Sequence, residues 1–551
     1  MIRLLPSGAL NFPKIMWLVW ACFIAKAMMY CAALPVWEGF DEYSHFACIQ
    51  HIALKHSMPA PDAHISREVR ASMRLMPVPW VIRDQDPDFT SYEAYWQLSE
   101  RERGRRDQEL RSLAPALGYD PGDGRFYTYE AQQAPLYYYA MAPVYWVIRD
   151  CDLGTRVWIL RILTALLASL VIPSAYFAVR QVISQAWLAV GFTVAIACLP
   201  QLLLSACRIS NEGLAIGAGG ITAALLLRCL DSPPSVRQGV WLGLALGAAL
   251  LTKAYFLAML PPAAVVCVFG WICGSRRDAA RQALAAAAVC GGIAGWWYVR
   301  TVLLTGSISG EQNDIAAHHS AMSLATAASR LNWWRAFDFL AISHIWLGNW
   351  SFLVVRSWMY RVVEGIAILG LAGAVLQFIR PRATLPRRDH LSLLALLWIV
   401  PVAGLCYHTL VGFSSIGAVS SMGYYLDAFI VPEMLLVITG LIRLLPERRA
   451  IWPGPVVAIL GLALEGFGTW LLLLPYYAGL IVHNAAGGLP AFPITEYSVD
   501  VVKMLAARIV VNKSAWMSEW LVFGLFGVAV IASVILAGVS FWERDRIEDR
   551  D

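Results

Sequence analysis

Two adjacent carboxylates, Asp41 and Glu42, come within a few residues of the first long apolar stretch of the chain. Phe46, Ile49 and Ala53 then recur with helical spacing, which predicts a helix that starts at the two acids. This helix is too short and too polar to span a bilayer, so we expect it to lie along the membrane surface. Acids at a helix N-terminus serve as caps, and capping explains one of the two. A carboxylate pair at a membrane face also suits a catalytic base with a helper, which is the role we predict.

Three basic residues, Arg208, Lys253 and Arg300, stand at the ends of apolar segments. A single residue of this kind is explained by snorkelling, in which the charged head reaches the lipid headgroups. Three cations on the side of the membrane that also holds Asp41 and Glu42 instead indicate an anion at that interface. The phosphate of a lipid fits, because the cations bind the phosphate while the carboxylates act on the group attached to it.

Further polar residues accompany both groups. Asn211 and Glu212 follow Arg208 directly and offer another acid on the same face, although a helix-capping role explains Asn211 equally well. Glu38 and His45 flank the carboxylate pair. We predict that all four contact the substrate.

The composition places these residues in a membrane protein. The chain has 551 residues, of which 58% are hydrophobic, and its mean hydropathy is +0.57. Soluble proteins are roughly half apolar or less, so the sequence predicts an all-α polytopic membrane protein. It contains no P-loop, no dinucleotide-binding glycine motif and no serine-hydrolase elbow. We therefore expect no nucleotide or nucleic acid partner, and chemistry driven by a membrane-borne substrate.

About twelve transmembrane helices must position the polar residues. Each is an apolar run of roughly the length that crosses a bilayer. We expect them at 15–34, 157–180, 184–206, 212–230, 238–254, 256–273, 281–303, 358–379, 390–411, 424–445, 451–474 and 518–541.

The distribution of arginine predicts the orientation. Short loops at 274–281, 380–389 and 443–449 are rich in arginine, which indicates the cytoplasmic side, and both termini fall on that side. The chain is then one membrane domain, 1–551, of a bacterial inner membrane, with its active site on the periplasmic side. We expect the long first segment to form a cap that contains a charged helix over 99–111 and an interfacial helix over 133–148. The extracytoplasmic segments are 35–155, 304–357 and 475–516.

Several short motifs resemble a known group of enzymes. Asp41-Glu42 is similar to the Asp-Glu that opens the first loop of protein O-mannosyltransferases, and Tyr129-Glu-Ala-Gln-Gln-Ala-Pro-Leu-Tyr-Tyr-Tyr139 resembles the His/Lys-Pro-Pro-Leu-Tyr-Tyr motif of aminoarabinose and mannosyl transferases. The chain thus resembles the GT-C superfamily of integral-membrane glycosyltransferases. Residues 35–46 also resemble the opening of a broad bacterial membrane-protein family without an assigned function. Motifs that recur in that family in the same order are Leu199-Pro-Gln, Ser210-Asn-Glu212, Leu251-Thr-Lys253, Gly295-Trp-Trp-Tyr-Val-Arg300 and, more loosely, Gly423-Tyr-Tyr-Leu426.

The resemblance implies roles for individual residues. Asp41 matches the catalytic acid, Glu42 its neighbour, and Glu212 the acid of the second loop. Gln133 stands where the resembled enzymes have His or Lys, and this change shifts the expected phosphate contact to the three cations named above. The residues expected to contact substrate are Glu38, His45, Gln133, Tyr137, Tyr138, Asn211, Glu212, Tyr424 and Tyr425.

The implied activity is an inverting sugar transfer from a polyprenyl-phosphate donor to a hydroxyl of a glycan, lipid or protein acceptor. Asp41 or Glu42 acts as the base, and Arg208, Lys253 and Arg300 stabilise the leaving phosphate. No metal-ligand spacing is present in the sequence, although some members of the superfamily use a divalent metal. A lipid-linked sugar transporter or flippase, a lipid-glycan ligase and a non-catalytic glycolipid-binding protein stay open as alternatives. The transporter is favoured by Asp427, a charge within an expected span.

Overall fold

The structure is a computed structural model that describes residues 12–60, 63–113, 128, 130–309, 323–417, 419 and 421–541. Within these ranges the chain is helical, with two isolated β-bridges and no strand. The apolar helical segments are α1 (Lys14–Ala33), α8 (Leu153–Ser169), α9 (Val171–Val182), α10 (Ala186–Ala197), α11 (Pro200–Ala206), α12 (Asn211–Asp231), α13 (Val236–Leu250), η2 (Ala254–Met259), α14 (Leu260–Cys273), α15 (Arg276–Cys290), η3 (Gly291–Gly295), α16 (Trp296–Thr305), α20 (Ser357–Ile379), α21 (Arg388–Ile416), η5 (Gly423–Phe429), α22 (Ile430–Leu444), α23 (Pro453–Glu465), η7 (Gly466–Leu473), α24 (Leu474–Tyr477) and α26 (Glu519–Phe541).

Shorter helices fill the segments between the spans. They are α2 (Glu42–Lys55), α3 (Arg67–Leu75), α4 (Trp80–Arg83), α5 (Tyr92–Gln97), α6 (Glu100–Arg111), α7 (Leu136–Ile148), α18 (Leu324–Arg330), α19 (Trp333–Ile345), η4 (Asn349–Ser351), η6 (Glu447–Arg449), η8 (Ile494–Glu496) and α25 (Val499–Ile509). The helices predicted over 99–111 and 133–148 are α6 and α7. Tyr129 and residues 114–127 of the first segment, and 310–322 of the second, lie outside the described residues.

The membrane-spanning architecture follows the sequence prediction closely. Ten helical stretches of the described chain are long and apolar enough to cross a membrane. The span predicted at 184–206 is a pair, α10 and α11, bent by 63°, with Pro200 at the first position of α11. Proline lacks the amide hydrogen that would continue the helix, which explains the break. The span predicted at 238–254 is α13, which has 15 residues.

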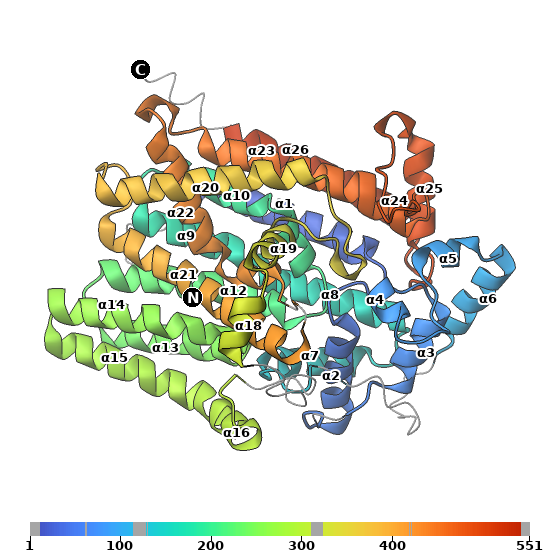
Figure 1. Ribbon diagram of the computed structural model, residues 1–551, viewed down its shortest axis with the longest axis horizontal. Coiled ribbons are helices and arrows are strands. Elements are labelled where there is room, and N and C mark those ends of the chain that lie inside the picture. The colour runs from blue at the N-terminus through green and yellow to red at the C-terminus, as the bar shows by residue number, and fades with distance from the viewer. Residues whose placement is uncertain are drawn as a thin grey trace.

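Close packing against α15 holds the short helix α13 in the bundle. Gly239 and Gly243 face α15 so tightly that an added Cβ would lie 2.3 Å from the carbonyl oxygen of Gln282 and 2.6 Å from that of Ala286. Small residues spaced by four let two helix backbones approach closely, and van der Waals contacts between the backbones then stabilise the helix pair. The pair α13 and α15 runs side by side at one edge of the bundle (Figure 1).

The first long segment forms a cap at one end of the bundle. In Figure 1 the helices α2 to α6, in blue, gather at the right end of the long helices, next to α25 in red. Arg156 of α8 forms a fully buried ion pair with Glu68 of α3, and the Trp96 indole donates to the carbonyl oxygen of Tyr477 at 2.8 Å. The side chains of α2 are buried within this cap rather than exposed along a surface.

The arginine-rich ends lie at the opposite end of the bundle from the cap. α12 runs from Asn211, beside the cap, to Asp231, and its 21 residues span about 30 Å, the thickness of a bilayer core. At its far end Arg387 donates to Asp231 at 2.6 Å, and Arg382 donates to the carbonyl oxygen of Leu445 at 2.7 Å. The charged ends expected to share one membrane face therefore meet in the structure.

Candidate active site

A buried polar centre forms where the cap meets the ends of the spans. Its residues come from the stretch before α2, the turn between α11 and α12, the turn between α13 and η2, and the 3₁₀ segment η5. The amide of Leu136, at the start of α7, donates to the carbonyl oxygen of Leu251 at 2.9 Å and joins the end of the first segment to this centre. Residues far apart in the sequence thus lie in one place, among them Asp41, Arg208 and Lys253.

Asp41 stands at the N-terminus of α2 without capping it. Its backbone is left-handed, with φ of 54°, and its side chain makes no capping hydrogen bond. Such a conformation is uncommon for a residue other than glycine and is found where surrounding structure enforces it. Burial raises the pKa of the Asp41 carboxyl to about 6, while the charges of Lys253 and Arg208 oppose the rise. The carboxylate is therefore available for chemistry.

Glu42, the neighbouring acid, is fully occupied. The Arg161 guanidinium donates to its two carboxylate oxygens at 2.7 and 2.6 Å, and the Ile209 amide donates to one of them at 3.0 Å. Both charged side chains are buried. A bidentate pair of this kind fixes geometry, so Glu42 ties the start of α2 to α8. The capping explanation fails for both acids.

Arg208 is the opposite case, a buried cation without a hydrogen-bond partner. It is 0% exposed, and none of its three guanidinium nitrogens has a partner among the described residues. The guanidinium carbon lies 4.2 Å from the ring centre of Tyr424 and 5.0 Å from that of Phe40. Gly39 makes room for it, since a Cβ there would lie 2.7 Å from the Cβ of Arg208. A buried guanidinium without hydrogen-bond acceptors among the described residues is costly even with the Asp41 charge nearby, so this arrangement is suited to a ligand anion.

Lys253 and Glu212 form an ion pair beside Arg208. The Lys253 ammonium lies 2.5 Å from a carboxylate oxygen of Glu212, and the Tyr255 hydroxyl donates to the other oxygen at 2.8 Å. Lys253 also lies 4.9 Å from the ring centre of Tyr425. Asn211 donates to the carbonyl oxygen of Thr252 at 3.4 Å. Ser210, rather than Asn211, caps α12.

Glu130 belongs to the same centre although the sequence analysis did not select it. Its side chain is 4% exposed, and its backbone amide donates to the Ser44 hydroxyl at 3.0 Å. His45 lies between Tyr138 and Ser210, at 2.9 Å through Nδ1 and 3.2 Å through Nε2. Burial lowers the pKa of His45 well below its usual range. An acid inside the aromatic motif at 129–139 was the signal that could have identified Glu130.

Glu38 is buried and serves as an anchor. It accepts hydrogen bonds from the Tyr92 hydroxyl at 2.7 Å and from the Ser351 amide at 2.9 Å. Its own carbonyl oxygen accepts from the Trp350 amide at 3.2 Å. Burial raises the pKa of the Glu38 carboxyl to about 7. These contacts fasten η4 to the cap.

Three of the predicted residues do not join the centre as side chains. Arg300 is exposed on α16, with its guanidinium carbon 5.0 Å from the ring centre of Trp297. It thus lies apart from the buried Arg208, because α16 is at the outer edge of the bundle with α15 (Figure 1), and its part in binding the anion stays a prediction. The Tyr137 hydroxyl is 2.6 Å from that of Thr164. Gln133 is half-buried and contacts Glu130 through its backbone amide.

Asp427 has the polar partner that a charge in a span requires. Its carboxylate lies 3.5 Å from Nδ1 of His344, and Nε2 of His344 lies 3.0 Å from Glu433 of α22. His344, Asp427 and Glu433 thus join α19 to η5, which also contains Tyr424, and to α22. They therefore support the segment that covers Arg208.

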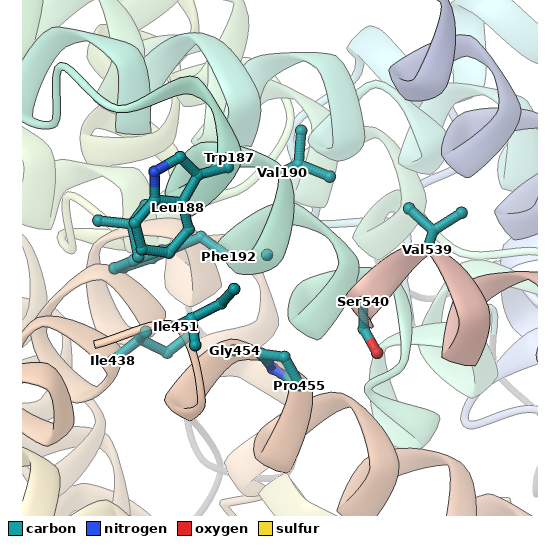
Figure 2. A pocket seen from close by; sticks show the side chains of 11 residues that line it. Trp187, Leu188, Val190, Phe192, Ile438, Ile451, Gly454, Pro455, Val539 and Ser540 are labelled. Carbon is teal, nitrogen blue, oxygen red and sulfur yellow. The ribbon is translucent and has the colours of Figure 1, made fainter. Parts of the chain in front are cut away.

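An apolar hollow lies elsewhere in the bundle. Figure 2 shows it between α10, α22, α23 and α26, lined by side chains such as Trp187, Phe192, Ile438 and Pro455. Ser540 supplies a hydroxyl, and no charged side chain lines the hollow. It offers no charged group for binding a phosphate or a carboxylate.

The fold and the centre define a polytopic helical membrane protein with a buried polar site at one end of its spans. A family model described as "Predicted membrane protein (DUF2142)" matches residues 23–425, and the chain belongs to this family. Two crystal structures of ArnT from Cupriavidus metallidurans are also similar, each at 14% identity. The one bound to undecaprenyl phosphate aligns over 96% of this chain and 76% of its own, with a TM-score of 0.42. The apo structure aligns over 89% and 75%, with a TM-score of 0.38. No curated protein sequence matches the chain.

Proposed function

We propose that this protein is an inverting glycosyltransferase that moves a sugar from a polyprenyl-phosphate donor to an acceptor hydroxyl. The observation that carries the proposal is the buried guanidinium of Arg208 beside the carboxyl of Asp41. Arg208 lacks hydrogen-bond acceptors among the described residues, and the nearby Asp41 carboxylate makes no capping hydrogen bond. That pairing suits a reaction in which a phosphate leaves as a hydroxyl is deprotonated.

The phosphate binds at Arg208. Its three guanidinium nitrogens lack partners among the described residues, and a phosphate oxygen pair matches the fork geometry of guanidinium. Lys253 lies in the same centre but is neutralised by Glu212. The guanidinium of Arg208 therefore supplies unbonded donors for the phosphate.

Asp41 acts as the general base. Glu42 is held by Arg161 through both of its oxygens and cannot turn toward a substrate without breaking that pair. Asp41 accepts the proton of the acceptor hydroxyl as the hydroxyl oxygen bonds to the anomeric carbon. The bond from that carbon to the phosphate oxygen breaks, and Arg208 and Lys253 stabilise the charge that develops on the phosphate. No covalent intermediate forms.

The reaction takes place at the extracytoplasmic face of a bacterial inner membrane. The arginine-rich ends of the bundle, which favour the cytoplasm, lie about one bilayer thickness from the centre. A lipid-linked donor reaches such a position within the plane of the membrane. The described residues hold no cluster of three or more His, Cys, Asp or Glu side chains suited to a metal ion.

The experiment is sugar transfer by the purified protein from a panel of polyprenyl-phosphate sugars, comparing the wild type with Asp41→Asn. We expect the substitution to lower kcat by about 10²–10⁴-fold with donor binding retained. Glu109→Gln, which removes an exposed carboxyl of α6, is the matched control and keeps the wild-type rate. Equal rates in Asp41→Asn and the wild type remove the base assignment. A wild type that moves lipid-linked sugar across vesicles without transfer would establish the transporter instead.

A further inference from the structure

Three carboxyl groups meet in the polar centre, and the proposed mechanism assigns no role to one of them, Glu130. Glu212 has Lys253 at 2.5 Å, and Asp41 is the proposed base. Glu130 stands near both acids, since their charges raise its pKa. In the part of the chain that the structure describes, no cation lies within ion-pair distance of Glu130.

The position of Glu130 is fixed by its neighbours. Its amide is bonded to Ser44 in the first turn of α2, and Tyr138 bonds its side chain. The remaining oxygen, Oε2, is buried without a hydrogen-bond partner among the described residues. A buried polar atom in this state costs free energy until a ligand satisfies it.

The charges around Glu130 favour its neutral form. The groups that face it are Asp41, Tyr43 and Cys48 beside or on α2, Tyr138 on α7, Glu212 on α12 and Lys253 before η2. Burial and the Asp41 charge raise the pKa of Glu130 to about 8, against the opposing charge of Lys253. Glu212 is paired with Lys253 and Asp41 lies beside Arg208, whereas Glu130 has no such cation among the described residues, so Glu130 is the acid that keeps its proton.

We propose that Glu130 is a neutral hydrogen-bond donor that binds an oxygen of the donor sugar beside Asp41. A protonated carboxyl has one hydroxyl to donate and one oxygen that accepts, and Tyr138 bonds the accepting side. The hydroxyl at Oε2 then needs an acceptor, and sugars supply oxygens at every ring position. The inference rests on the proposed transferase function, and it makes Glu130 a binding residue rather than a base.

The test compares Glu130→Gln with Glu130→Ala in the sugar-transfer assay between pH 6 and 10. In the wild type kcat/KM falls above about pH 8, because Glu130 loses the proton it donates. The glutamine variant keeps an uncharged donor at the same place, so its kcat/KM does not fall in that range. The alanine variant removes the donor and raises the donor KM by about tenfold at pH 7. The control Glu109→Gln keeps the wild-type pH profile.

A second measurement reports the proton directly. The infrared difference spectrum of the wild type minus Glu130→Gln at pH 7 should contain the carbonyl stretch of a protonated carboxylic acid, because Glu38, whose pKa is about 7, contributes to both proteins and cancels. An alkaline fall in Glu130→Gln equal to that of the wild type overturns the proposal, as does the absence of the infrared band. Turnover by the wild type separates this failure from a failure of the transferase function, because a wild type without turnover overturns both.

Discussion

Replacing Arg208 with methionine should stabilise the ligand-free protein and weaken the binding of its ligand. A buried guanidinium without hydrogen-bond acceptors among the described residues costs several kcal/mol, offset only in part by the nearby Asp41 charge and by two cation–π contacts of about 2 kcal/mol each. Methionine fills a similar volume without the charge. We therefore expect Arg208→Met to stabilise the ligand-free protein by an amount on the order of 1–3 kcal/mol and to raise its apparent midpoint of thermal unfolding.

The same substitution removes the proposed phosphate contact. Each hydrogen bond to a charged group contributes about 1.5–3 kcal/mol, so loss of one or more weakens binding by at least about tenfold. A ligand present at one hundred times its dissociation constant stabilises a protein by about 2.7 kcal/mol. We expect polyprenyl phosphate to raise the unfolding midpoint of the wild type and to leave that of Arg208→Met nearly unchanged.

A second buried arginine provides the matched control. Arg156 is also 0% exposed, but it is paired with Glu68 and bonded to the Tyr145 hydroxyl at 2.7 Å. Arg156→Met leaves the Glu68 carboxylate buried without its counter-ion, which costs about 3–5 kcal/mol. The assay is thermal unfolding of the two variants in detergent with and without polyprenyl phosphate. If Arg208→Met lowers the midpoint as much as Arg156→Met does, Arg208 has a partner within the protein and the reasoning for an anion site is refuted.

Three further predictions concern the neighbours of Arg208. Glu42→Gln leaves Arg161 without its counter-ion and should destabilise the protein by about 3–5 kcal/mol, measured by thermal unfolding. Gly39→Ala places a Cβ 2.7 Å from that of Arg208, so we expect a lower midpoint by overpacking and weaker binding of polyprenyl phosphate. Burial raises the pKa of Asp41 to about 6, so the stability from this group is lost as pH rises through that value. Asp41→Asn should therefore unfold at a higher temperature than the wild type at pH 8 but not at pH 4, and wild-type transfer should fall as pH drops below about 6.

Controls separate these effects from general damage. Gly365→Ala adds a Cβ where no atom lies within 4 Å, and it should leave both the midpoint and ligand binding as in the wild type. A stable Glu42→Gln protein that has lost transfer would contradict the structural role given to that residue. A midpoint difference for Asp41→Asn that persists unchanged at pH 4 would show that the effect is not titration of this carboxyl.

The sequence was sufficient for the spans, and it selected Arg208 and Lys253, whose charges both act on Asp41. Apolar runs and arginine-rich ends are strong signals because a bilayer tolerates few exceptions to them. The sequence could not distinguish Asp41 from Glu42, since the difference between them is set by Arg161, which is distant in the chain. Arg161 was itself visible as a charge inside an apolar span, and a search for its counter-ion among the acids would have pointed to Glu42 or its neighbour.

Two residues show what the sequence analysis could not determine. Arg300 ends an apolar run just as Arg208 and Lys253 do, yet α16 follows a π-helical segment, η3, and stands at the edge of the bundle. Position along a span says nothing about which lateral neighbours a residue meets. Glu130 was not predicted, because the resembled motif has its phosphate-binding residue at the position of Gln133. The place of Glu130 is set by Ser44, which accepts from its backbone amide, and by Tyr138, which bonds its side chain.

The contacts of Glu38 and Arg208 have a consequence for how the protein is made. Glu38 binds the amide of Ser351, and Arg208 lies over the ring of Tyr424, so early spans depend on late ones. Because a nascent membrane protein is synthesised from its N-terminus, Asp41 and Arg208 enter the membrane well before Tyr424 exists. During translation the guanidinium has only the Phe40 ring to pack against, because Tyr424 and the turn at η4 are not yet made. The centre is therefore completed only when the span that begins at η5 is inserted, and a chain interrupted before that point contains both charged groups without the site they form.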